Sequence, residues 1–120
     1  MITVQLEVPI FFSGSEIRHI KEGVVSVLAA SLEPSELSPW HWSVFKPVDQ
    51  EPAGVFVTVQ DYPRGISDHL RKVAVELAQE IRLLHQELAV SVTVRLTDSE
   101  NQGMVFLEKD KTPDQRELFS

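Results

Sequence analysis

Apolar and polar residues alternate strictly at the start of the chain, over residues 2–10. Every second residue is aliphatic, and the polar residues Thr3, Gln5 and Glu7 stand between them. A period of two residues is typical of a strand that buries one face and leaves the other face polar. The pattern therefore predicts that the chain begins with a strand whose aliphatic side belongs to a core.

The period changes to that of a helix beyond Phe12. Ser13 and Glu16 have the spacing of a capping box, and Phe12 stands where a hydrophobic staple packs onto the first turn. Apolar residues then recur at intervals of three and four, as Ile17, Ile20, Val24, Val27 and Leu28. We expect a helix that begins at Ser13 and ends before Pro34.

Residues 67–86 carry the strongest helical pattern of the chain. Seven apolar residues share one side, at Leu70, Val73, Ala74, Leu77, Ala78, Ile81 and Leu84. The other side is charged, as expected for a helix that covers a core with one face and meets water with the other. Ser67 is the expected N-cap of this second helix.

Three more segments alternate as strands do, and a short strand follows them, at residues 40–48, 55–62, 88–96 and 104–107. The order is β-α-β-β-α-β with a short terminal strand. Because crossovers between parallel strands are right-handed, both helices should lie on one face of the sheet. We therefore expect a single α+β domain over residues 1–107, a two-layer sandwich with two helices on a mixed four-stranded sheet. The charged end, residues 108–120, is expected to be a flexible tail.

The face of the sheet turned away from the helices is intermediate in polarity. The alternation assigns to it Thr3, Gln5, Glu7, His41, Ser43, Phe45, Phe56, Thr58, Gln60, Ala89, Ser91, Thr93 and Arg95. A solvent-washed face usually carries more Lys and Glu, and a core carries more Val and Leu. Two interpretations stay open, a half-exposed sheet and the inner surface of an oligomer. We also expect Trp40 and Trp42 to face opposite ways along their strand.

Composition and charge exclude several classes of protein. The formal net charge of −7 argues against non-specific binding to nucleic acid or anionic membranes, which requires a basic surface. The absence of cysteine excludes disulfides, thiolate nucleophiles and cysteine-based zinc sites. No apolar run approaches the roughly 18 residues of a membrane span, and the first residues do not have the pattern of a signal peptide. We expect a cytoplasmic protein that handles small molecules or binds a neutral or basic partner protein.

The sequence contains no complete catalytic, metal or phosphate motif. Its four histidines lack the H-x-x-x-H and H-E-x-x-H spacings, its glycines form no phosphate-binding loop, and no G-x-S-x-G elbow occurs. We therefore expect neither a metal nor another cofactor. His41, between two tryptophans, is either a wall or acid–base group of a site or a packed strand histidine.

The order and spacing of these elements resemble the tautomerase superfamily, which includes macrophage migration inhibitory factor. The resemblance covers residues 1–107 and is carried by Pro34-Ser35-Glu36-Leu37-Ser38 followed by His41-Trp42-Ser43-Val44, by Tyr62-Pro63-Arg64, and by Val92-Thr93-Val94-Arg95-Leu96-Thr97-Asp98. It implies a homotrimer whose three sheets line a central barrel. Such an assembly would account for the intermediate polarity of the face that the helices leave open.

The resemblance also implies keto–enol chemistry, in which a proline at the amino terminus acts as general acid or base. The matching position here is Ile2, and Met1 should be retained because the residue after it is large. The resemblance therefore implies a protein that binds or isomerises a small keto or enol carboxylate, with weak or no activity because the proline is absent. No catalytic residue is assigned.

Basic side chains bind substrate carboxylates in that family, and a guanidinium fork suits a carboxylate. Arg95 and Arg64 stand at positions that resemble polar or basic sites of the family, and Lys46 is a further candidate. With Ile2 and His41 they are the residues that we expect at a substrate site; the alternative for each cation is an ordinary solvated charge. Two other interpretations stay open, a non-catalytic, ferredoxin-like oligomeric module for protein interaction and a small dimeric barrel enzyme.

Overall fold

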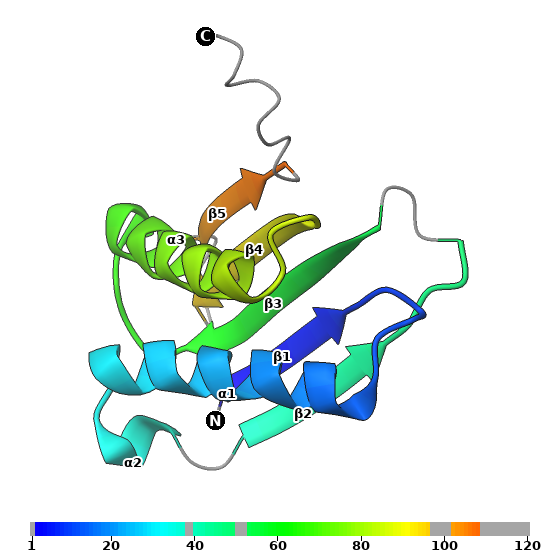
Figure 1. Cartoon of the computed structure of the whole chain (residues 1–120). Coiled ribbons are helices and arrows are strands. Elements are labelled where there is room, and N and C mark those ends of the chain that lie inside the picture. Colours follow the sequence, from blue (N-terminus) through cyan, green and yellow to red (C-terminus); the bar gives the residue numbers. More distant parts are fainter. Residues whose placement is uncertain (1, 38–39, 50–52, 97–101, 109–120) are drawn as a thin grey trace, which may run out of the picture.

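The computed structural model describes residues 2–37, 40–49, 53–96 and 102–108 (Figure 1). Its elements are β1 (Ile2–Glu7), α1 (Gly14–Ser31), α2 (Pro34–Leu37), β2 (Trp40–Phe45), β3 (Gly54–Tyr62), α3 (Ser67–Leu84), β4 (Ala89–Leu96) and β5 (Gln102–Leu107). Most of the expected tail, from residue 109 onward, lies outside the described residues. In the described part of the chain, no helix has both the length and the apolar character needed to cross a membrane.

The strands form one mixed sheet in the order β2-β1-β3-β4-β5. Each long helix connects two adjacent parallel strands, α1 between β1 and β2 and α3 between β3 and β4, and the two units meet where β1 and β3 pair antiparallel. Both long helices cover the same face of the sheet (Figure 1). The expected α+β layout with two long helices on one face is confirmed.

The strand order differs from that of a ferredoxin-like domain. In a split βαβ unit another strand lies between the two parallel strands, whereas here β1 pairs directly with β2 and β3 pairs directly with β4. The ferredoxin-like arrangement that we left open is therefore wrong for this chain.

The expectation of a four-stranded sheet is also wrong, because β5 pairs antiparallel with β4 along its length. Gly103 explains how a fifth strand fits under α3. A Cβ at this position would lie 2.1 Å from the backbone nitrogen of Arg71 and 2.2 Å from the carbonyl carbon of Leu70. The backbone of α3 therefore rests directly on β5, and only glycine leaves room for that contact.

A local capping signal sets the start of α1 but not the start of α3. The predicted capping box is present, with Ser13 N donating to Glu16 Oε1 at 2.8 Å and Glu16 N donating to Ser13 Oγ at 3.1 Å. Helix α3 begins at Ser67 itself, so its N-cap is Ile66 and not Ser67 as expected. Ile66 forms no side-chain cap. The short helix α2 was not predicted, because a helix of four residues that begins at a proline offers too little periodicity to be recognised.

The core lies between the sheet and the two long helices. Its strand members are the aliphatic positions predicted from alternation, all at most 2% exposed: Ile2, Val4, Leu6, Val55, Val57, Val59, Val90, Val92 and Val94. The apolar stripes of α1 and α3 cover them from one side. The opposite side of the sheet is left without a covering helix, which makes it an open face (Figure 1).

Candidate functional site

The five residues expected at a substrate site do not converge. Ile2 is fully buried in the core at the start of β1. Lys46 follows the last residue of β2, at the other end of the sheet, where its Nζ donates to the Phe12 carbonyl oxygen at 2.8 Å. A strand of this length spans roughly 17 Å at about 3.3 Å per residue, so Ile2 and Lys46 cannot contact one small ligand.

Arg64 lies in the turn before α3, where it forms an ion pair with Glu36 of α2. The Arg64 side chain is 52% exposed and that of Glu36 is 23% exposed, so water weakens this pair. Beside it, burial raises the pKa of Tyr62, and the Arg64 charge partly opposes that rise. The nearby Ser31 hydroxyl also lowers this pKa. The Tyr62 hydroxyl oxygen nevertheless forms no hydrogen bond with any described residue. This group of residues lies near the helix layer and not on the open face.

His41 and Arg95 are exposed on the open face but belong to β2 and β4. The strands β1 and β3 lie between them, which corresponds to a separation of about 14 Å at ~4.8 Å per strand. Arg95 Nε donates to Gln102 Oε1 of β5 at 3.0 Å. Arg64 lies at the same end of the sheet as Arg95, because Tyr62 pairs with Leu96, but Arg64 is paired with Glu36 and Arg95 is bound to Gln102.

The register confirms which residues occupy the open face. One row of neighbouring residues crosses all five strands, in the order Phe45, Glu7, Phe56, Ser91 and Phe106, and we call it the aromatic row. Phe45 of β2 is 49% exposed. On β5, Phe106 is 55% exposed, and Met104, two residues before it, is 54% exposed. The middle of the face carries hydroxyl side chains, such as the paired Thr58 and Thr93. The face thus combines an aromatic end with a hydroxyl-rich centre.

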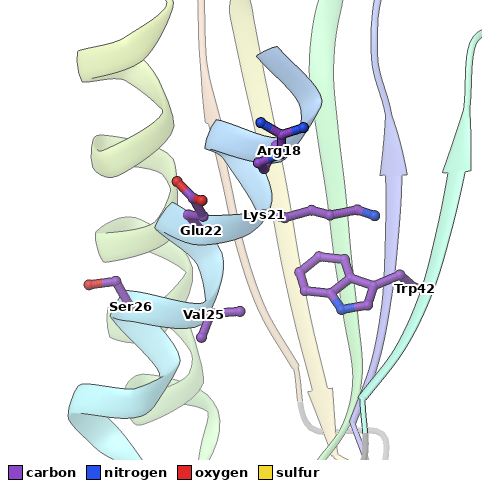
Figure 2. A pocket seen from close by; sticks show the side chains of 6 residues that line it. All are labelled: Arg18, Lys21, Glu22, Val25, Ser26 and Trp42. Carbon is purple, nitrogen blue, oxygen red and sulfur yellow. The ribbon is translucent and has the colours of Figure 1, made fainter. Parts of the chain in front are cut away.

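A groove that sequence reasoning missed lies on the other side of the sheet, between α1 and the edge strand β2 (Figure 2). Its volume is about 380 Å³, and its lining residues are Arg18, Lys21, Glu22, Val25, Ser26 and Trp42. We refer to it as the β2 groove. The signal that could have indicated it is the i, i+3, i+4 and i+7 spacing of the lining residues of α1, beside the buried stripe.

Trp42 forms the wall of the β2 groove on the strand side. Its ring stacks on that of Trp40, with centroids 5.4 Å apart and planes tilted by 10°. The expectation that the two tryptophans face opposite ways is therefore wrong, because residues two apart on a strand point to the same face. Lys21 extends from α1 across the groove, with its Nζ 5.4 Å from the Trp42 centroid, whereas Glu22 and Ser26 point away from Trp42 (Figure 2).

The described residues contain no group of three or more His, Asp or Glu side chains placed to hold a metal ion. Comparisons of the chain with protein-family models, with curated proteins and with solved structures find no match. Three features of the molecule therefore bear on its function: the strand order, the open face of the sheet and the β2 groove.

Proposed function

We propose that this chain is a tautomerase-like protein that assembles with copies of itself, as a trimer, through the open face of its sheet. In this proposal the assembly binds a small keto or enol carboxylate and isomerises it weakly or not at all. The observation that carries the proposal is the aromatic row, which leaves Phe45 and Phe106 about half exposed on a face that no helix covers.

The composition of the open face favours contact with another copy. The aromatic row places Phe45, Phe56 and Phe106 on one side of the sheet, and burial of a phenylalanine side chain stabilises an interface by about 1.5–3 kcal/mol. A chain of net charge −7 repels its own copies. Among the described positions assigned to the open face, however, only Glu7 and Arg95 carry a formal charge. Self-association through this face therefore costs little electrostatic repulsion.

The placement of Ile2 supports the absence of efficient proton transfer. A general base must lie within hydrogen-bond reach of the proton that it removes, and it contributes typically 10²–10⁴-fold to the rate. The Ile2 side chain is fully buried and has no titratable group.

A carboxylate-binding role is proposed for Arg95. Its guanidinium is exposed on the open face and is held by Gln102, a neutral side chain that a carboxylate can displace. Gln102, the residue that pairs with Arg95 on the neighbouring strand β5, is neutral and supplies no second cation. We therefore place the proposed carboxylate site between copies, where neighbouring faces bring several Arg95 side chains together.

Two measurements test the proposal. Light scattering should give a mass of three times the chain mass of 13.6 kDa. A monomer would exclude assembly through the open face, and a dimer would favour the dimeric barrel interpretation. Turnover of phenylpyruvate-type enols should be at least about 10²-fold slower than that of proline-bearing tautomerases. Comparable turnover would refute the proposed loss of activity and leave the assembly proposal standing.

A further inference from the structure

The outer edge of β2 presents backbone groups that have no partner in the described part of the chain. Strand β2 pairs only with β1, and the Phe45 carbonyl oxygen accepts from Val8 N at 3.0 Å, on the β1 side. Because backbone direction alternates along a strand, Trp42 and Val44 direct their N–H and C=O groups away from β1. Trp40 has the same parity, so three residues of β2 offer hydrogen bonds to an additional strand.

This edge lacks the features that usually prevent strand addition. Natural sheets protect their edges with Pro, Lys, bulges or a covering segment. The six residues of β2 contain no Pro, no Lys and no acidic residue, and the pairing with β1 runs without a bulge. Lys46 follows the strand, but its ammonium group is bound to the Phe12 carbonyl. Nothing in β2 itself opposes the approach of another chain.

The β2 groove adds selectivity to the free edge. The side chains of Trp42 and Val44 lie on the helix side of the sheet, where the groove supplies an apolar wall at Val25 and Trp42 and cations at Lys21 and Arg18 (Figure 2). Lys21 and Arg18 outnumber the one acidic residue of the lining, Glu22, so the groove carries a net positive charge on a chain of net charge −7. A segment that lies along the edge would therefore place an apolar side chain against Trp42 and an acidic one near Lys21.

We infer that the free edge of β2 and the β2 groove together bind an extended segment of another protein, in which an aliphatic or aromatic residue and an acidic residue stand two positions apart. Strand addition supplies the backbone hydrogen bonds, and the groove selects the side chains. The spacing of two follows from the strand period, which places both selected side chains on the groove side. This site is separate from the open face on which the proposed assembly depends.

A second copy of the chain fits this edge less well. Pairing of β2 with β2 about a two-fold axis brings the two sets of Arg18 and Lys21 towards each other. Like charges that face each other across paired strands destabilise the pair. An acidic segment meets the opposite situation, because its carboxylate lies beside two cations.

The test uses two labelled peptides with the sequences Ser-Thr-Val-Thr-Leu-Thr-Glu-Thr-Ser and Ser-Thr-Val-Thr-Leu-Thr-Lys-Thr-Ser, titrated into the full chain. The acidic peptide should bind more tightly than the lysine peptide by about tenfold or more. Lys21→Glu should invert this preference. Lys72→Glu is the matched control, because Lys72 is an exposed lysine on α3 and does not line the groove; it should leave the preference unchanged.

A backbone variant separates strand addition from simple charge attraction. Val44→Pro removes an outward N–H while the hydrogen bonds to β1 remain, as is tolerated on edge strands. It should weaken the acidic peptide by at least about tenfold without a change in oligomer mass. If Val44→Pro does not fold, the inversion by Lys21→Glu still decides. Absence of binding up to about 1 mM, or equal binding of both peptides, would overturn the inference, whereas the oligomer mass tests the proposed function independently.

Discussion

At the scale of single residues, Tyr62 is an unusual component of the core. It is the largest of the fully buried side chains in the described residues, yet its hydroxyl oxygen has no hydrogen-bond partner among them. Burial raises the pKa of Tyr62 above its usual 10.0, because the phenolate would lose its hydration. The ring stabilises the fold, while the unpaired hydroxyl group costs free energy of desolvation.

We expect Tyr62→Phe to leave the free energy of unfolding near pH 7 unchanged or to raise it by about 1 kcal/mol, because the ring remains and an unpaired polar group is removed. In the parent chain, the free energy of unfolding should fall as the pH rises from 10.0 to the raised pKa of the folded state. The reason is that Tyr62 ionises in the unfolded chain before it ionises in the folded chain. The variant should lack this part of the alkaline loss. Urea unfolding near pH 7 and near pH 11 measures both effects. A clear loss of stability near pH 7 would mean that the hydroxyl has a stabilising partner.

At the scale of elements, two glycines set how closely α3 packs on its neighbours. Gly103 of β5 meets the α3 backbone, with a built Cβ 2.1 Å from Arg71 N. Gly23 of α1 faces α3 from the other side, but a Cβ there would meet the flexible Glu80 side chain, whose Cγ lies 3.0 Å away. Backbone cannot move aside as a glutamate side chain can, so the two positions should respond differently to the same added methyl group.

Gly103→Ala should lower the free energy of unfolding by about 1–3 kcal/mol or more, because α3 and β5 must separate to accommodate the methyl group. Gly23→Ala should be neutral or should stabilise by up to about 1 kcal/mol, since alanine is a better helix former than glycine. Chemical denaturation of the two variants and the parent chain measures the difference. Equal effects of both substitutions would contradict the close packing of α3 on β5.

At the scale of the whole molecule, the surfaces differ in what they offer to a partner. The helix layer covers one side of the sheet (Figure 1). The open face presents the aromatic row, and the edge strand β2 borders the groove. Exposed apolar side chains also occur on the helix layer, such as Leu83 at 71%. A substitution there therefore serves as a control for the loss of apolar surface as such.

Phe106→Ser and Phe45→Ser should each weaken self-association, because each removes an aromatic side chain worth about 1.5–3 kcal/mol when buried, or roughly tenfold or more in the dissociation constant. Leu83→Ser should leave the oligomer mass unchanged. Light scattering over a dilution series, with circular dichroism to verify folding, makes the comparison. Dissociation by Leu83→Ser, with no effect of the two phenylalanine variants, would place the interface on the helix layer.

Local patterns in the sequence were sufficient for the two long helices and the strands, and for most of their buried residues. The alternation of β1 and the stripe of α3 depend on each residue and its near neighbours, because side-chain direction repeats with the period of the element itself. The capping box of Ser13 and Glu16 is local in the same way, and the structure contains it. The residues of the open face could be assigned for the same reason.

Contacts between remote residues decided the rest. The direct pairing of β1 with β2 and the position of β5 under α3 depend on strand order and register, which no local period encodes. The same holds for the β2 groove, which exists because an edge tryptophan meets a helix some twenty residues earlier in the chain. It also holds for Arg95 and Lys46, which the sequence placed in one hypothetical site. Tertiary structure separated them, since the distance between two side chains is set by the elements that lie between them.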